Sequence, residues 1–143
     1  MKYLLDTNAC IHYLNHEDSP VRKRMELMLS DDVVICSVVK AELWFGANKS
    51  RRRADTMDSL EFFFRTLSSL FFDDKSALIY GKIRAELATA GRPIGPNDLM
   101  IAAIAMANDI TLVTHNTGEF SRVKGLKTED WEISEPVLSC KNS

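Results

Sequence analysis

Three carboxylates of this 143-residue chain lie where apolar runs give way to polar residues. Asp6 ends the apolar run near the N-terminus, Glu42 lies one turn into the helix expected after the second run, and Asp98 begins the most apolar helical pattern. Asn116 and Glu119 follow a later apolar run. In open parallel sheets, ligands bind outside the carboxyl ends of the strands. These five residues are therefore predicted to converge on one edge of a sheet.

An acidic cluster of this kind predicts a divalent metal. Alone, Asp6 could cap a helix, Glu42 could be solvated, and Asp98 could be stabilised by a helix dipole. Together they repel, since two carboxylates about 5 Å apart cost roughly 3 kcal/mol at an effective dielectric of 20. Carboxylate oxygens without His or Cys select Mg²⁺, with Mn²⁺ as a plausible substitute. Such a site suits phosphoryl chemistry, in which the metal activates water and neutralises charge on the phosphate.

The other candidate metal ligands do not form a rival site. The three histidines show no zinc-ligand spacing, and the three cysteines are odd in number with no ligand spacing. The N-terminal residues lack the apolar core of a signal peptide. The longest apolar run, residues 99–107, is far shorter than the ~20 residues of a membrane span. We expect a cytoplasmic protein without a membrane segment.

The elements that must position these residues alternate between strand and helix. We expect strands at residues 2–5, 33–36, 69–72, 111–113 and near 131–133, and helices at 9–14, 21–29, 38–47, 54–66, 75–90 and 98–108. Thr7 or Asn8 is expected to cap the first helix and Ser37 the third. Alternation predicts an α/β fold, a parallel sheet with helices on both faces. The length predicts one domain over residues 1–143, with a frayed tail at 137–143.

The sequence resembles the PIN-domain ribonucleases, specifically the VapC-type toxins of bacterial toxin–antitoxin pairs. Four blocks carry the resemblance in the family's order: residues 4–8 (LLDTN), 37–43 (SVVKAEL), 91–103 (GRPIGPNDLMIAA) and 112–120 (LVTHNTGEF). The resemblance implies a PIN-like three-layer αβα sandwich and a metal-dependent endoribonuclease of structured RNA, with tRNA the expected substrate. It also implies a homodimer and a cognate antitoxin protein.

The resemblance also assigns roles to individual residues. Asp6 and Asp98 match the aspartates that hold Mg²⁺ in the family, and Glu42 completes this core. The catalytic set is then these three residues with an acidic or polar group from the fourth block. The polar residues that match the surroundings of the metal ligands are Thr7, Asn8, Thr114 and Asn116.

The fourth block departs from the family pattern. Many relatives carry Asp where this sequence has the neutral Asn116. Glu119, three residues on, is able to restore the charge and is taken as the fourth catalytic residue. Which of the two faces the metal, and whether a second metal binds, is left open by the sequence.

An acidic ribonuclease needs local positive charge. The chain has 18 Lys and Arg against 20 Asp and Glu, a net charge of −2, which by itself argues against a nucleic-acid partner. Arg51, Arg52 and Arg53 follow the Glu42 helix, and Arg92 lies in the loop before Asp98. Solvated helix faces explain such clusters too. As a hypothesis, these four arginines contact RNA phosphates, each adding to the salt dependence of binding.

Two other function classes compete. A haloacid-dehalogenase-like phosphatase, another Mg²⁺-dependent phosphoryl-transfer hydrolase, needs Asp-x-Asp after the first strand, and position 8 is Asn. A non-catalytic RNA-binding or interaction module on the same fold would not need several carboxylates around one pocket. Cleavage of RNA with and without metal separates that module from an enzyme.

Overall fold

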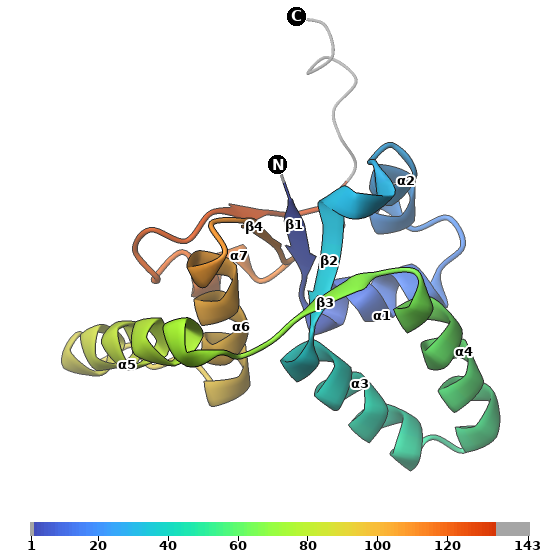
Figure 1. Cartoon of the computed structure of the whole chain (residues 1–143), viewed down its shortest axis with the longest axis horizontal. Helices are drawn as coiled ribbons and strands as arrows, with labels where there is room; N and C mark the ends of the chain where they lie inside the picture. Colours follow the sequence, from blue (N-terminus) through green and yellow to red (C-terminus); the bar gives the residue numbers. More distant parts are fainter. Residues whose placement is uncertain (1, 134–143) are drawn as a thin grey trace, which may run out of the picture.

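The computed structural model describes residues 2–133 of the chain (Figure 1). Its elements, in order, are β1 (Tyr3–Leu5), α1 (Thr7–Asn15), α2 (Pro20–Glu26), a 3₁₀ turn (Ser30–Asp32), β2 (Val33–Cys36), α3 (Ser37–Lys49), α4 (Arg53–Arg65), β3 (Ser68–Leu70), α5 (Asp74–Thr89), α6 (Pro96–Ala107), β4 (Thr111–Val113), α7 (Thr117–Phe120) and β5 (Thr128–Glu129). Among the described residues, no helix is long and apolar enough to cross a membrane.

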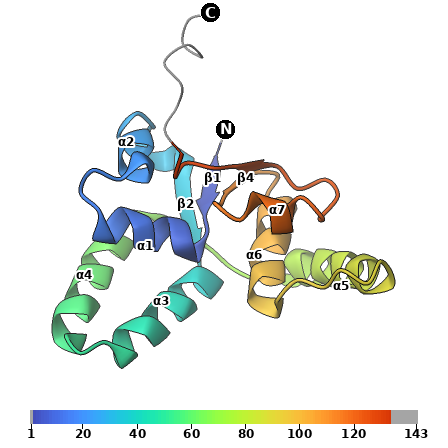
Figure 2. The same ribbon diagram turned by 180° about the vertical axis from the view of Figure 1, so that it is seen from behind.

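The five strands form one parallel sheet in the order β3-β2-β1-β4-β5. The central strand pairs Leu4 with Val34 on one side and with Leu112 on the other. All three side chains are buried, as in parallel sheets covered on both faces. Figures 1 and 2 show α1 to α4 on one side of the strands and α5 to α7 on the other. The predicted α/β sandwich with a central parallel sheet is confirmed.

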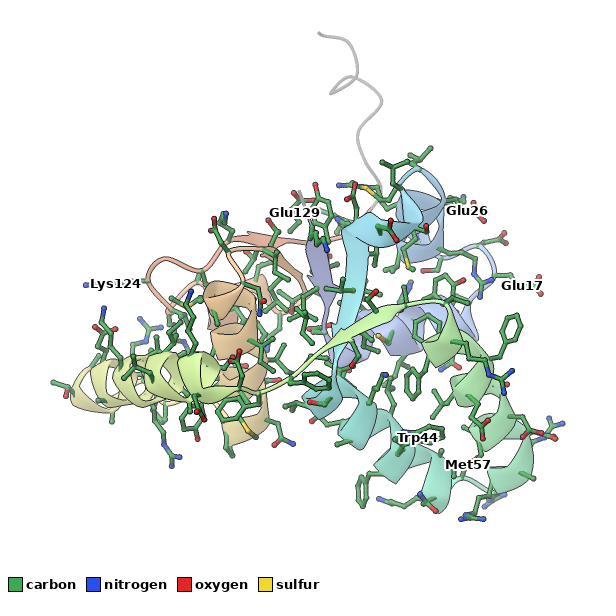
Figure 3. The ribbon with its side chains drawn as sticks, viewed as in Figure 1. Glu17, Glu26, Trp44, Met57, Lys124 and Glu129 are labelled. Atoms are coloured by element: carbon green, nitrogen blue, oxygen red, sulfur yellow. The ribbon has the colours of Figure 1, made fainter. Side chains whose placement is uncertain are left out.

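Two buried segments fix the positions of the catalytic candidates. Helix α6 is buried along most of its length, from Leu99 to Ala107, so the core anchors the helix that carries Asp98. Trp131 is fully buried, and its ring lies 5.1 Å from that of Tyr3 in β1. This contact holds the segment after β5 against the central strand. Farther out, Trp44 and Met57 lie between α3 and α4 (Figure 3).

The predicted helix caps are wrong. Asp6 caps α1 in place of Thr7 or Asn8, which confirms the cap role considered for Asp6 as an alternative: its backbone is extended, and its carboxylate accepts a 2.8 Å hydrogen bond from the Ala9 amide. Ser37 is the first residue of α3, and the residue before it, Cys36, makes no side-chain cap bond. Both helices thus begin directly where their strands end, one residue or more before the expected position.

The C-terminal part also differs from the prediction. The expected strand at residues 131–133 is absent from the described structure; β5 lies three residues earlier, because Trp131 is used as a core side chain. The expected loop after β4 contains the short helix α7. The predicted frayed tail, residues 137–143, lies outside the described residues.

Candidate active site

Asp6 lies at the carboxyl end of the central strand and is only 5% exposed. Burial raises the pKa of its carboxyl to about 6, against the hydrogen bonds from Thr114 and the Ala9 amide, which lower it. The charges of Glu132 and Glu42 raise this pKa further. Asp6 therefore carries its negative charge in a position where the fold alone disfavours it.

Glu42 lies in the second turn of α3 and joins three helices. The Thr7 hydroxyl, at the start of α1, donates to Oε1 of Glu42. The Asn97 side-chain amide, at the start of α6, donates to Oε2 at 3.2 Å. These bonds orient the carboxylate toward the space between the helix starts.

Asp98 lies in the first turn of α6 and is half-buried. Burial raises the pKa of its carboxyl to about 6, and the hydrogen bond and charge of Glu119 contribute next. The charges of Glu42 and Asp6 add to the shift. The carboxylates of Glu119, Glu42 and Asp6 are thus all close enough to Asp98 to oppose its ionisation. We refer to Asp6, Glu42, Asp98 and Glu119 as the acidic pocket.

The structure separates the roles of the two fourth-block candidates. Glu119 in α7 lies close enough to Asp98 to raise the pKa of that carboxyl, so it belongs to the acidic pocket. Asn116 donates from its side-chain amide to Oε1 of Glu119 at 3.0 Å, and its backbone amide donates to Thr114 Oγ1 at 3.0 Å. Asn116 therefore holds the Glu119 side chain in position. Asn8 lines a neighbouring cleft.

The structure does not bring the predicted basic residues into the pocket. Arg51, Arg52 and Arg53, which we call the basic corner, lie at the turn between α3 and α4 and are exposed. Roughly 10 Å of helix axis separates Glu42 from the end of α3, at 1.5 Å per residue. Arg92 is also exposed, in the loop between α5 and α6 that leads to Asp98. Of the four arginines, it is the closest to the pocket along the chain.

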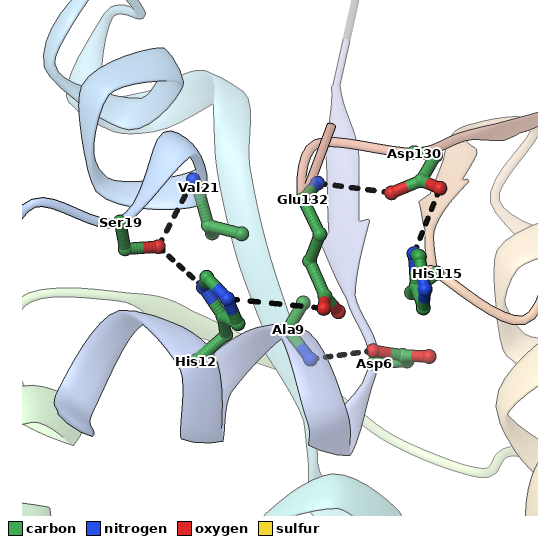
Figure 4. Close-up of polar contacts among 8 residues, drawn as sticks. All are labelled: Asp6, Ala9, His12, Ser19, Val21, His115, Asp130 and Glu132. Carbon is green, nitrogen blue, oxygen red and sulfur yellow. Dashed lines mark hydrogen bonds and ion pairs between the residues drawn. The ribbon is translucent and has the colours of Figure 1, made fainter. Parts of the chain in front are cut away.

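Two polar residues of this region were missed from the sequence. Asn97 immediately precedes Asp98, and its place at a helix start could have indicated a role. Glu132 gave no such signal, because it lies within residues 131–133, where the predicted strand was wrong. Figure 4 shows its carboxylate reaching toward His12 of α1 and lying near Asp6. Its charge raises the pKa of Asp6.

The donor set of the acidic pocket fits a hard cation. Its groups are carboxylate oxygens, with hydroxyl and amide groups bonded behind them. Within residues 2–133, no three Asp, Glu, His or Cys side chains form a ready-made group that could hold a metal ion. Mg²⁺ is commonly bound by one or two carboxylates and keeps several waters. An open site of that kind fits this arrangement, and a closed zinc cage does not.

Comparison with known proteins gives one consistent result. Residues 3–126 match the family described as PIN domain. The chain is 43% identical over 131 residues to the tRNA(fMet)-specific endonuclease VapC of Shigella flexneri, covering 92% of this chain and 98% of the relative. It is 38% identical to Ribonuclease VapC2 of Rickettsia felis, with 92% and 99% covered. The structure of DNA-bound VapBC from Salmonella typhimurium superposes with a TM-score of 0.87 at 39% identity, covering 92% of this chain and 98% of the other.

Proposed function

The chain belongs to the PIN domain family, with VapC ribonucleases among its relatives, and on that premise we propose that it is the endoribonuclease toxin of a toxin–antitoxin pair. One observation carries the proposal. Four carboxylates, one from the end of β1 and the others from α3, α6 and α7, converge at the carboxyl edge of the sheet, where Asp6 and Asp98 have a pKa raised to about 6. Burial is the largest cause of both shifts, and neighbouring carboxylates add to them. Carboxylates held in this way are common at functional sites.

Mg²⁺ is the proposed cofactor, and Mn²⁺ is the expected substitute. Asp6, Asp98 and Glu42 would hold it, since their oxygens are the ligands that hard cations prefer. When bound, the ion supplies charge neutralisation at the scissile phosphate and a more acidic water.

The chain's own residues have distinct roles in this proposal. Thr7 and Asn97 orient Glu42, and Asn116 orients Glu119. Glu119 lies close enough to Asp98 to raise the pKa of that carboxyl, and it is not among the proposed metal ligands. Glu119 is therefore the best placed to accept the proton that an attacking water loses.

The partners are proposed from the same relatives. The printed name of the Shigella flexneri relative gives tRNA(fMet) as its substrate, so a tRNA is the substrate class we propose. The similar structures from Salmonella typhimurium and Rickettsia felis are VapBC assemblies, which supports a cognate antitoxin as partner. A homodimer is proposed as well. The exposed apolar side chains Phe62, Phe71 and Leu78 are available for protein contacts.

The test is cleavage of a total RNA pool by the purified protein with Mg²⁺, with Mn²⁺ and with EDTA. Discrete products that disappear with EDTA and with Asp98→Asn support the proposal, and their sequencing identifies the substrate. Glu86→Gln on the exposed face of α5 serves as the matched control. A folded protein that cleaves nothing under either metal contradicts the proposal and favours a non-catalytic module.

A further inference from the structure

All three histidines of the chain border one open cleft beside the acidic pocket. The cleft has a volume of about 630 Å³. We call it the histidine cleft; its lining residues are Asn8, Ile11, His12, His16, His115, Asn116 and Glu132. None of the three histidines belongs to the acidic pocket.

The histidine cleft and the acidic pocket share a wall. Asn116, which lines the cleft, is bonded to Glu119 of the pocket. Asn8 follows Thr7, which is bonded to Glu42. Figure 4 shows Glu132 between His12 and His115, with Asp6 below. An RNA strand whose phosphate lies at the acidic pocket therefore has a neighbouring nucleotide within reach of the cleft.

One side of the cleft presents ring surface. The His12 ring is fixed by a 2.6 Å hydrogen bond between its Nδ1 and Ser19 Oγ, and Ser19 Oγ in turn accepts from the Val21 amide. The His16 ring lies against it, with ring centroids 4.7 Å apart, and is exposed. Ile11 of the same helix is 40% exposed. Bases of single-stranded RNA stack on surfaces of this kind.

The charged groups around the cleft indicate whether the phosphate or the base of a nucleotide binds there. Glu132 Oε1 lies 3.9 Å from His12 Nε2, and the Glu132 charge acts on the pKa of Asp6. On the other side, Asp130 Oδ2 holds the His115 ring through Nδ1 at 2.9 Å. The hydrogen bond with Asp130 raises the pKa of His115, so positive charge on that ring is offset by the Asp130 carboxylate. Glu132 faces His12 in the same way. The cleft therefore offers a phosphate little uncompensated positive charge, while its carboxylate oxygens can accept hydrogen bonds from the N–H groups of a base. The ligand group is therefore an uncharged base.

Among the RNA bases, guanine presents two adjacent N–H donors on its Watson–Crick edge, which one carboxylate accepts together. Adenine and cytosine present only an exocyclic amine there. Uracil flanks its single N–H with two carbonyls, which a carboxylate repels. We propose that the histidine cleft is a base-binding subsite for a guanine of the RNA substrate, stacked on His16 and bonded to Glu132. The proposal rests on the proposed ribonuclease function and deepens it.

The three histidines supply a specific probe, because every imidazole signal of the chain comes from this cleft. The full chain is titrated at fixed pH with guanosine, adenosine, cytidine and uridine, and the histidine ring signals are followed by NMR. Nucleosides are uncharged, so the acidic pocket and its metal do not contribute. We expect saturable shifts with guanosine and at least fivefold weaker affinity for the other three.

Two variants test the assigned contacts. Glu132→Gln is expected to lower guanosine affinity about tenfold and remove the preference over adenosine, since an amide has one acceptor oxygen and adds a donor. His16→Ala is expected to weaken guanosine and adenosine alike, as loss of stacking costs about tenfold or more per base. Glu86→Gln on α5 is the control. Unchanged amide spectra establish that each variant is folded.

Two outcomes overturn the subsite. One is the absence of saturable shifts with any nucleoside, and the other is equal affinity for all four. Guanosine should also inhibit RNA cleavage competitively in the wild-type protein. RNA cleavage without guanosine binding removes the subsite and leaves the proposed function standing. Guanosine binding without any RNA cleavage removes the proposed function and leaves a guanine-binding cleft.

Discussion

The acidic pocket and the basic corner each collect charge of one sign, but they do so in opposite ways. The pocket draws one carboxylate from the end of β1 and three from α3, α6 and α7, and the first of these, Asp6, is buried. The basic corner consists of three consecutive arginines, two in the turn after α3 and one at the first residue of α4, and all three are exposed. Arg52 is paired with Asp55 at 3.1 Å, and Arg53 donates to Asn48 at 3.0 Å.

This difference separates charge that the fold tolerates easily from charge that it opposes. Exposed arginines are screened by water and by local partners, so they cost and contribute little to stability. Carboxylates that are buried beside other carboxylates are costly to ionise, and burial followed by the neighbouring charges raises the pKa of Asp6 and of Asp98 to about 6. The pocket is therefore the stronger indicator of function, although the basic corner is the more conspicuous run in the sequence.

The largest expected effect comes from the pocket itself. Asp6→Asn and Asp98→Asn should each reduce RNA cleavage more than about 100-fold, beyond the 10–100-fold typical for residues that only support a metal ligand. Asn keeps the size of Asp and the cap of α1, so the fold should be retained. The measurement is single-turnover cleavage with Mg²⁺. Cleavage within threefold of wild type would remove these residues from the catalytic set.

A smaller loss is expected when the orientation of Glu42 is disturbed. Thr7→Val removes the hydroxyl that donates to Glu42 while keeping the β-branched shape. Cleavage should fall about 10–100-fold, with a higher Mg²⁺ concentration needed for half-maximal rate. Thr7→Ser, which restores the hydroxyl, should recover most of the activity. A Thr7→Val enzyme with unchanged metal dependence would show that this bond does not position Glu42 for metal.

The pocket should also be visible in stability without metal. Asp6 and Asp98 have folded pKa values near 6, above the ordinary 3.8, so the folded state binds more protons between these values. Their contribution to stability is present below about pH 4 and lost as the pH rises through about 6. Asp6→Asn should therefore stabilise the metal-free protein by roughly 1–3 kcal/mol at pH 8 and much less at pH 4. Urea unfolding at both pH values measures this, and equal shifts at both would contradict it.

The smallest expected effects belong to the arginines. Replacing all three arginines of the basic corner by Ala should weaken RNA binding tenfold or less, with kcat unchanged, because the corner lies far from the pocket. Each lost phosphate contact should lower the salt slope of binding by about 1. Arg92→Ala should likewise weaken RNA binding and leave kcat unchanged. Unchanged affinity and salt slope in the triple variant would remove the corner from the RNA path.

The sequence predicted the sheet well because its strands are short apolar runs. Residues 33–36 and 111–113 were placed with the observed bounds, since β-branched side chains buried on both faces leave little choice. The two-residue β5 was missed because Thr128 and Glu129 are half-buried and polar. The strand was predicted near Trp131 instead, because this residue is apolar; in the structure, Trp131 is a buried core residue outside the strands.

The sequence predicted which residues form the candidate site, but not the hydrogen bonds and contacts that position them. Strand ends placed Asp6, Glu42 and Asp98 at one edge, and the structure brings them together there. The choice between Asn116 and Glu119 depends on the turn of α7, a four-residue helix that no periodicity predicts. Glu132 lies near the pocket because the neighbouring Trp131 packs against Tyr3. This tertiary contact cannot be predicted from the local sequence.

Because the helices around the pocket are buried to different extents, the two sides of the pocket differ in their stability against local unfolding. Helix α6, with Asp98 at its start, is enclosed by the core, so its amide protons should exchange with solvent only when the whole domain opens. Helix α3, with Glu42, exposes Phe45 and its C-terminal end, so it can open locally at lower free energy. When the pocket opens and closes, Glu42 would then move with α3, while Asp98 stays in place on α6.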